Sequence, residues 1–274
     1  LLQMKIFKNK ISLIKEISKK KDISFIPTMG SIHKGHLSLI NKAKKQSKNI
    51  LVSIYINPKQ FNSSSDFRKY PRNLNKDIEL LKKTKLKYLY IPDNKDIYSF
   101  KTSKPVYLDK FSLKLCGQFK QGHFRGVIDV VNRFLDIINP NLIYLGMKDF
   151  QQLSLIKSHI RKNKINTKVV SCLTMRDHRG VALSSRNIRL NENQKNIAAQ
   201  IYMFLKKNKK IILSKNLNNK KNEVFNDMKK FGINKIDYIE CLNLKTLKKP
   251  KKINEKFNLF VAYYLGSVRL IDNL

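Results

Sequence analysis

The stretch Pro27-Thr28-Met29-Gly30-Ser31-Ile32-His33-Lys34-Gly35-His36 decides the fold. It follows the apolar run 23–26, which predicts a short buried strand, and it leads into a helix predicted from about residue 36 to residue 46. A second β-rich run, residues 50–56, stops at Asn57-Pro58. Strand, loop, helix and strand in this order predict a βαβ unit.

The alternation of helices and strands continues as far as residue 174. Helices are predicted at 5–20, 74–83, 127–138 and 150–161, and strands at 88–91, 142–145 and 168–173. Such alternation is typical of a parallel sheet with helices on both faces. We therefore expect an α/β fold, with a Rossmann-like parallel sheet domain over residues 1–174.

The pattern changes after residue 174. Helices at 192–205 and 224–231 and strands near 237–241 and 258–264 predict a smaller α+β C-terminal domain, residues 175–274. The Lys- and Asn-rich stretch 206–221 is the segment that we expect to be most mobile.

The charge of the chain favours a different class of function from its motifs. The formal net charge is +38, which is typical of proteins with a nucleic-acid or anionic-membrane partner. However, 47 of the 57 basic residues are lysines spread along the whole chain, whereas base readout and bidentate phosphate recognition favour arginine. We expect diffuse surface charge and no specific nucleic-acid partner; a nucleic-acid-binding protein is the alternative from another class.

Hydropathy and cysteine usage indicate the compartment. No stretch approaches the roughly 18 consecutive apolar residues of a membrane span, and the beginning LLQMKIFKNK lacks a signal peptide's apolar region. Cys116, Cys172 and Cys241 are far apart and form no CxxC or Cys/His grouping, so neither a disulfide framework nor a zinc site is indicated. We expect a soluble, cytoplasmic protein without a membrane partner.

The loop at residues 28–35 has the position and the residue types of a phosphate site. In an open parallel sheet, ligands bind beyond the carboxyl ends of the strands, and a helix N-terminus offers N–H groups and a positive dipole. Gly30 and Gly35 allow close approach, and His33 and His36 can donate hydrogen bonds to phosphate oxygens. The structural alternative is a glycine-containing turn with two incidental histidines.

Other polar segments also follow predicted strands or precede helices. Asn57 and Gln60 carry neutral amides, which suit a hydroxyl-bearing substrate because each offers a donor and an acceptor. Lys148 would neutralise phosphate charge, while Asp149 would hold ribose hydroxyls or simply cap a helix. Two more segments are Ser184-Ser185-Arg186, either a triphosphate clamp or a turn, and His123-Phe124-Arg125-Gly126, for which binding and structural roles are equally open.

Several common catalytic motifs are absent: the GxxxxGK[ST] P-loop, the GxGxxG fingerprint, the GxSxG elbow and HExxH. What is left is a chemistry that needs only positioned cations and dipoles. Taken together, the segments resemble the pantothenate synthetase family of the HxGH nucleotidylyltransferase superfamily. The resemblance runs along nearly the whole chain and rests on the order and spacing of PTMGSIHKGH (27–36), NPKQF (57–61), DFRKYPRNL (66–74), GHFRGV (122–127), GMKDFQQL (146–153), LSSRN (183–187) and VAYYLGSVRLIDN (261–273).

The resemblance implies an ATP-dependent ligase that joins pantoate to β-alanine through a pantoyl-adenylate, releasing AMP and diphosphate. It also implies Mg²⁺ on the phosphates, with ligands that stay unassigned, a homodimer, and a second domain that acts as a lid. The implied catalytic residues are His36, as proton donor, and His33 beside it; Lys148 is added because the first step needs positive charge around the α-phosphate. The implied substrate-binding residues are Gln60 for both pantoate and β-alanine and Gln152 for pantoate, and Asn57 is added on the strength of its amide and its position. The implied ATP-binding residues are Met29, Gly30, Ser31, Ile32, His33, Lys34, Gly35, His36, Gly146, Met147, Lys148, Asp149, Met175, Leu183, Ser184, Ser185 and Arg186.

The chain departs from the family pattern in three places. Met147 stands where the family usually has Glu, and Lys120-Gln121 stand where it usually has Arg-Pro. A lysine keeps the charge but lacks the bidentate fork of arginine, which predicts weaker phosphate contact there. Residues 1–3 precede Met4, which aligns with the usual family beginning, so we expect them to be an upstream extension. A nucleotidyltransferase that stops at an adenylated or cytidylylated product is the alternative within the superfamily.

Overall fold

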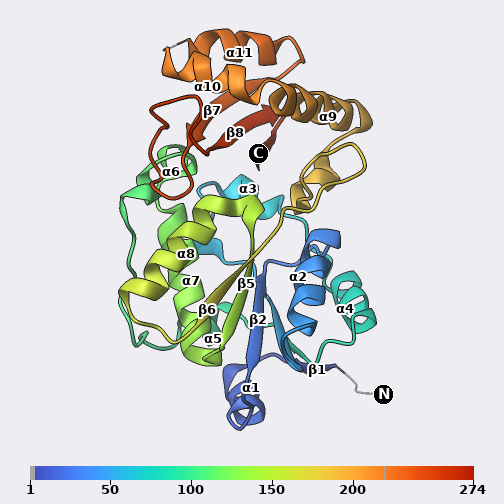
Figure 1. The fold of residues 1–274 in the computed structure, drawn as a ribbon. Helices are drawn as coiled ribbons and strands as arrows, with labels where there is room; N and C mark the ends of the chain where they lie inside the picture. Colours follow the sequence, from blue (N-terminus) through green and yellow to red (C-terminus); the bar gives the residue numbers. More distant parts are fainter. Residues whose placement is uncertain (1–3, 219) are drawn as a thin grey trace. The chain divides into compact units, whose positions relative to one another are not determined.

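The computed structural model describes residues 4–218 and 220–274 (Figure 1). The chain divides into two compact units. The first runs to Ser112 and resumes over Lys120–Thr174, and the second combines Leu113–Phe119 with Met175–Leu274. The second unit thus includes residues 113–119, which lie inside the predicted range of the first domain. The predicted upstream extension, residues 1–3, lies outside the described residues.

The first unit is built on a six-stranded sheet in the order β1-β4-β3-β2-β5-β6, and all neighbouring strands are parallel. Figure 1 shows α2 and α4 on one side of this sheet and α7 and α8 on the other. The strands are β1 (Lys5–Phe7), β2 (Ile23–Thr28), β3 (Asn49–Ile54), β4 (Tyr88–Tyr90), β5 (Leu142–Gly146) and β6 (Lys168–Cys172). The Rossmann-like parallel sheet is therefore confirmed.

The helices of the first unit follow the predicted alternation, with additional short elements between them. The α-helices are α1 (Lys10–Ile17), α2 (Lys34–Lys44), α3 (Ser64–Arg68), α4 (Leu74–Lys83), α5 (Asn94–Tyr98), α7 (His123–Ile138) and α8 (Phe150–Lys162). Three short 3₁₀ turns are η1 (Pro58–Gln60), η2 (Lys110–Leu113) and η3 (Met147–Asp149). On the side of the sheet that α7 covers, the ring of Phe134 packs against those of Phe25, Tyr55 and Tyr90.

The prediction of one helix over residues 5–20 is wrong at its beginning. β1 pairs with β4, and the backbone N–H of Lys5 donates to the Lys87 carbonyl at 3.0 Å. Asn9 then caps α1, because its side chain accepts a hydrogen bond from the N–H of Ser12. A three-residue edge strand is too short to show a periodicity of its own, and its apolar residues read as part of the helix that follows.

The second unit has a separate core around an antiparallel sheet in the order β7-β8-β9. Its elements are α6 (Cys116–Phe119), η4 (Ser185–Arg189), α9 (Glu192–Lys207), α10 (Lys209–Leu217), α11 (Lys221–Lys229), β7 (Lys235–Leu242), β8 (Asn258–Leu265) and β9 (Val268–Asn273). The predicted α+β character is confirmed, but β9 was not expected from the sequence. The Lys- and Asn-rich stretch forms α10, in which Ile212 and Leu213 are buried; position 219 of that stretch lies outside the described residues.

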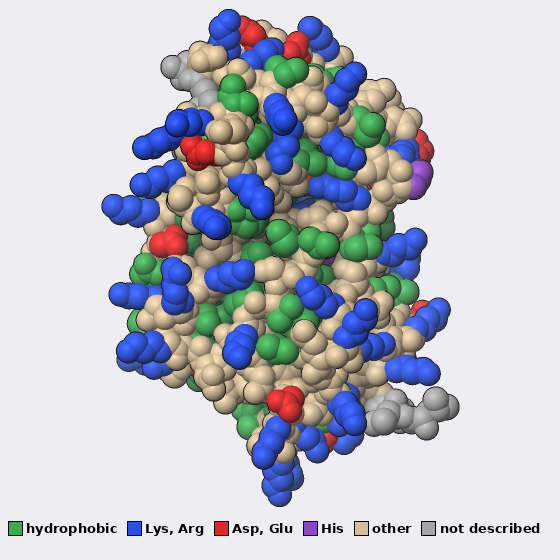
Figure 2. All heavy atoms as spheres, viewed as in Figure 1, with side chains coloured by type: hydrophobic (Ala, Val, Ile, Leu, Met, Phe, Trp, Pro, Cys, Tyr) green, Lys and Arg blue, Asp and Glu red, His purple; other side chains and the backbone are tan. Residues whose placement is uncertain are grey.

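The structure shows where the basic side chains and the cysteines of the chain lie. Figure 2 shows lysine and arginine side chains over the whole visible face rather than in one patch. Cys116, Cys172 and Cys241 are free thiols, and all three are buried. Within the described ranges, no helix is both long and apolar enough to cross a membrane.

Helices α7 and α8 share a buried histidine. His159 on α8 is fully buried, and its Nε2 lies 3.0 Å from Oδ1 of Asn132 on α7. Its Nδ1 accepts from the backbone N–H of Tyr107 at 3.2 Å and lies 3.1 Å from Nδ2 of Asn163. Since a backbone N–H can only donate, Nδ1 carries no proton and the ring is neutral with its proton on Nε2.

The burial of His159 makes stability depend on pH. Burial lowers its pKa from 6.5 to about 4, and the nearby Asp136 opposes that shift. Below pH 6.5 the unfolded chain therefore binds a proton that the folded chain excludes. The contribution of this histidine to stability is present above pH 6.5 and is lost as the pH falls toward 4.

We expect His159→Asn to flatten the pH dependence of the free energy of unfolding between pH 6.5 and 4. The slope should fall by up to about 1.4 kcal/mol per pH unit, the linkage value for one proton. Urea unfolding followed by circular dichroism at several pH values measures both slopes. Equal slopes for the wild type and the variant would contradict the neutral, buried state of this ring.

Candidate active site

The three central strands of the sheet bring the predicted segments of the first unit to one edge. β2 pairs in parallel with β3 on one side and with β5 on the other. The carboxyl ends of β2, β3 and β5 lead into the loop 28–33, the turn 57–60 and the turn 147–149. The winding direction of the sheet reverses between β2 and β5, and ligands of open parallel sheets bind at such a reversal.

A buried carboxylate holds the loop that precedes α2. Asp77, in the first turn of α4, is 3% exposed and accepts the backbone N–H groups of Ser31 and Ile32, both at 2.7 Å. Sequence reasoning did not find Asp77. The available signal was its position four residues before the fully buried Leu81, on the apolar face of an amphipathic helix. A charged residue on that face requires a partner, because a buried charge is costly unless it is hydrogen-bonded.

Three more backbone N–H groups of this segment have acceptors within the protein. The N–H of Gly30 donates to Oγ1 of Thr28, that of His33 to Nδ1 of His36, and that of Gly35 to Nδ1 of His33. The backbone N–H groups of residues 30–33 and of Gly35 are therefore used within the protein. The two imidazole rings are donors that the loop can present instead.

These hydrogen bonds fix the tautomer of both rings. His33 is the N-cap of α2, and His36 completes the reciprocal capping box. Each Nδ1 accepts from a backbone N–H, so each ring is neutral and carries its proton on Nε2. The ring centroids lie 4.1 Å apart, with 33° between the ring planes. The capping box thus prepares two neighbouring Nε2–H donors.

Electrostatics keeps both histidines neutral. Burial lowers the pKa of His33 from 6.5 to about 4; Lys148 lowers it further and Asp149 opposes the shift. Burial also lowers the pKa of His36 to about 3, with a further contribution from His33. At neutral pH both rings therefore donate hydrogen bonds as uncharged groups.

Lys148 and Asp149 lie at the carboxyl end of β5. Nζ of Lys148 lies 3.3 Å from Oδ1 of Asp149, and the two side chains are 18% and 49% exposed. Because both residues shift the pKa of the histidines, the β5 segment lies within electrostatic reach of the α2 N-terminus. Gln152 is partly buried in the first turn of α8. Gly146 is the last residue of β5, and Met147 begins the 3₁₀ turn η3 that leads into α8.

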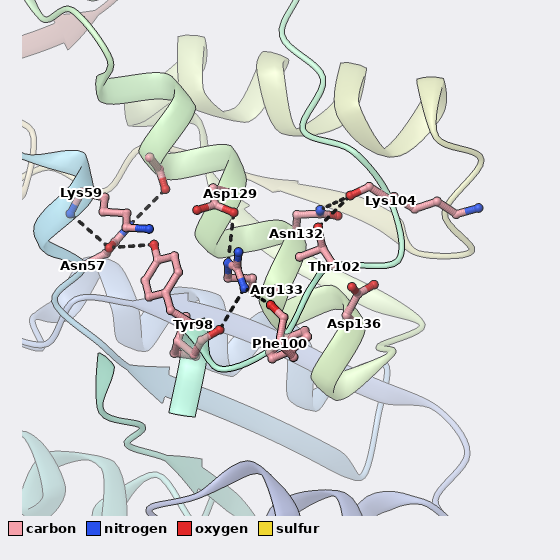
Figure 3. A network of polar contacts seen from close by, with 12 residues as sticks. Asn57, Lys59, Tyr98, Phe100, Thr102, Lys104, Asp129, Asn132, Arg133 and Asp136 are labelled. Carbon is pink, nitrogen blue, oxygen red and sulfur yellow. Dashed lines mark hydrogen bonds and ion pairs between the residues drawn. The ribbon is translucent and has the colours of Figure 1, made fainter. Parts of the chain in front are cut away.

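The turn after β3 is held by its own first residue. Asn57 has no exposed surface; its Oδ1 accepts from the N–H of Lys59 at 3.2 Å and from the hydroxyl of Tyr98 at 3.1 Å (Figure 3). Its Nδ2 donates to the Gly126 carbonyl at 3.0 Å. Both acceptor positions of the amide are thus used within the protein, which leaves Asn57 only an N–H to offer a substrate.

Gln60 lies in the same turn and contacts two other predicted segments. Its side-chain amide donates to Sδ of Met29 in the loop before α2. Its carbonyl lies 2.6 Å from Nδ1 of His123, at the beginning of α7. A Cβ on Gly126 would lie 2.2 Å from the Lys59 carbonyl oxygen, so only glycine allows α7 to pack this closely. His123 and Gly126 therefore have a structural role in placing the turn.

The predicted ATP residues of the second unit form a compact hairpin. The N–H of Leu183 donates to the Met175 carbonyl at 2.9 Å. Oγ of Ser184 accepts from the backbone N–H of Arg186 at 3.3 Å, which begins η4 immediately after the hairpin; Ser185 is the first residue of η4. Arg176, which sequence reasoning did not single out, makes a bidentate ion pair with Asp272.

A metal site is not preformed in the described part of the chain. No group of three or more His, Cys, Asp or Glu residues there lies close enough together to hold an ion. Mg²⁺ commonly binds through substrate phosphates rather than in an all-protein cage.

We expect Gly30→Ala to destabilise the first unit, whereas Gly146→Ala leaves its stability nearly unchanged. Gly30 has φ +78°, and an added Cβ would lie 2.9 Å from Oδ2 of Asp77. The strain of a positive φ and the displaced carboxylate together predict a loss of about 1–3 kcal/mol. Gly146 has φ −74° and open space around its Cβ position, so it serves as the control in urea unfolding. A Gly30 variant as stable as its control would contradict the role of Asp77.

Comparison with known proteins gives one family. The family model for pantoate-beta-alanine ligase matches residues 4–274. A pantothenate synthetase from Pseudothermotoga lettingae is 38% identical over 95% of this chain and 94% of its own length. One from Flavobacterium psychrophilum is 39% identical over 93% of this chain and 92% of its own.

Solved structures agree with the sequence comparison. A pantoate-beta-alanine ligase from Francisella tularensis has a TM-score of 0.83 and 36% identity, covering 99% of this chain and 97% of that one. A pantothenate synthetase from Thermus thermophilus has a TM-score of 0.89 at 27% identity, covering 99% of both chains. Since the family match reaches from residue 4 to the last residue and both kinds of relative agree, this chain belongs to the pantoate-beta-alanine ligase family, also known as the pantothenate synthetases.

Proposed function

We propose that the site at the carboxyl ends of β2, β3 and β5 condenses pantoate with β-alanine at the expense of ATP. Family membership confirms the predicted ligase activity; the assignment of residues to steps is the proposal. The observation that carries it is the pair of neutral histidines with fixed Nε2–H donors beside Lys148. The ligase from Francisella tularensis was solved with β-γ ATP and β-alanine, which supports ATP and β-alanine as substrates here.

The first step forms pantoyl-adenylate. A carboxylate oxygen of pantoate attacks the α-phosphorus of ATP, the bond from that phosphorus to the bridging oxygen breaks, and diphosphate leaves. Negative charge accumulates on the phosphate oxygens, and the Nε2–H groups of His33 and His36 donate to them while Lys148 supplies a formal positive charge. Neutral donors stabilise this charge without a proton transfer, so the role of His36 is hydrogen-bond donation.

The second step uses the same turn residues. The amine of β-alanine attacks the activated acyl carbon, AMP leaves with the bonding electrons, and the nitrogen loses a proton to form the amide. Gln60 is proposed to bind both pantoate and β-alanine, and Gln152 to bind pantoate. Buried Asn57 holds the turn through its hydrogen bonds within the protein, and its predicted contact with substrate stays a proposal. No covalent enzyme intermediate is needed.

The remaining ATP contacts are proposed in two groups. The first group is the loop Met29–His36 with the segment Gly146–Asp149, and the second group is Met175 with Leu183–Arg186. Mg²⁺ is proposed to arrive on the triphosphate, which fits the lack of a preformed carboxylate cluster in the described residues. The ion would neutralise phosphate charge when bound.

The lid role of the second unit, a homodimer and a cytoplasmic location stay predictions from the family resemblance. Sedimentation equilibrium at low and high protein concentration measures the oligomeric state. A monomer at all concentrations would contradict the dimer without affecting the proposed chemistry.

The function is tested by mixing the purified chain with ATP, Mg²⁺, pantoate and β-alanine and resolving the products, with each substrate omitted in turn. We expect pantothenate and AMP only in the complete mixture. Diphosphate release that never leads to pantothenate would indicate a nucleotidyltransferase with a different acceptor. No turnover under any condition would contradict the proposed function.

The role of His36 is tested by two substitutions. His36→Ala removes the donor and should slow diphosphate release by at least about 100-fold, the usual effect of losing one donor to a developing charge. His36→Gln keeps an N–H near the position of Nε2 and should retain clearly more activity than the alanine variant. Rapid-quench measurement of diphosphate release compares them, with urea unfolding as a check on the fold. Equal losses in both variants would contradict simple hydrogen-bond donation.

A further inference from the structure

The amide of Asn57 has its orientation set by the hydroxyl of Tyr98, the last residue of α5. An amide oxygen has no hydrogen, so the Tyr98 hydroxyl is the donor in this bond. Burial raises the pKa of that hydroxyl, and Asp129 raises it further by a smaller amount. The hydroxyl therefore stays protonated. The bond fixes Oδ1 toward Tyr98 and thereby turns Nδ2 toward the Gly126 carbonyl.

The Tyr98 ring is held in turn by two cations. Nζ of Lys59, from the turn itself, lies 3.7 Å from the ring centroid, and the guanidinium carbon of Arg133 lies 4.5 Å from it (Figure 3). Both distances are within the range of cation–π attraction. The ring therefore links the turn after β3 to α7, which carries Arg133.

Arg133 is itself fixed on several sides. Its Nε pairs with Oδ1 of Asp129 at 3.0 Å, one turn earlier on α7. Its Nη1 donates to the carbonyls of Ile97 and Phe100, at 3.3 and 2.7 Å, at the carboxyl end of α5. A cation at the C-terminal end of a helix is also favoured by the helix dipole. The side chain is 14% exposed, so solvent weakens these contacts little.

We propose that Tyr98 and Arg133 are positioning residues for pantoate: they fix the amide of Asn57 and, through it, the turn that places Gln60. This inference rests on the proposed function, because it assumes that Gln60 binds pantoate. Neither Tyr98 nor Arg133 carries a reacting group. Their effect should therefore appear in the affinity for the substrate of this turn, while the ATP residues keep their geometry.

Tyr98→Phe is the direct test, because it removes one hydroxyl and keeps the ring between its two cations. We expect the KM for pantoate to rise about fivefold to tenfold, the size expected for one lost hydrogen bond. The KM for ATP should change less than about twofold, because the α2 loop is held by Asp77. Steady-state kinetics with each substrate varied in turn measures both values.

Tyr55→Phe is a matched control. The Tyr55 hydroxyl also donates to an asparagine Oδ1, that of Asn94 at the other end of α5, at 3.0 Å. The control removes a bond of the same kind from the same helix without touching Asn57, so the KM for pantoate should stay at the wild-type value. An equal rise in both variants would mean a general loosening of α5 and would overturn the inference.

Arg133→Lys tests the second residue without removing its charge. Lysine lacks the planar fork that reaches Asp129 and the α5 carbonyls together, so we expect a rise of about twofold to fivefold in the KM for pantoate. If both residues act through Asn57, the double variant should resemble Tyr98→Phe rather than multiply the two effects.

The outcomes separate this inference from the proposed function. An active wild type with an unchanged KM for pantoate in Tyr98→Phe would overturn the positioning role alone. A wild type that forms no pantothenate would overturn the proposed function and this inference with it.

Discussion

The buried carboxylate of Asp77 is the interaction on which the geometry of the site depends. By binding two consecutive backbone N–H groups at 2.7 Å each, it sets the path of the loop between β2 and α2. That path places His33 at the N-cap of α2, and the capping box then fixes both imidazole tautomers. A phosphate-binding loop with free N–H groups would use its backbone as the donor, whereas this loop uses its backbone to orient side chains.

The net charge of the chain does not determine the charge of the donor groups at the site. The formal net charge is +38, and basic side chains cover the visible face in Figure 2. At the site, however, two of the donors are neutral, because burial and neighbouring Lys148 disfavour protonation. A neutral donor needs no counter-ion before the nucleotide arrives and has no charge to lose when the product leaves. Lys148 adds a positive charge beside the two rings, and Asp149 adds a negative one.

Much of the first unit was predictable because its strands are apolar runs separated by helices of clear periodicity. The 3-residue strand β1 was not, since it is recognisable only through its pairing with β4. The site was predictable where a motif follows a strand, as for His33, His36 and Lys148. Asp77 escaped prediction because its role depends on which loop α4 packs against. The use of Asn57 as an internal support was equally hidden, since an exposed and a buried amide read alike in a sequence.

Residues 113–119 belong to the second unit, although they lie within the sequence of the first. Cys116 in this segment has Sγ 3.1 Å from the Tyr238 hydroxyl and receives contacts from the Arg269 guanidinium, both within the second unit. The backbone therefore passes from one unit to the other after residues 112, 119 and 174. A fragment that ends at residue 174 would contain α6 without its partners Tyr238 and Arg269. The fragment that begins at residue 175 would lack α6, and the side of β7 and β9 that contacts Cys116 would be uncovered. The two units are thus interleaved along the chain, and one proteolytic or genetic cut does not yield two complete folding units.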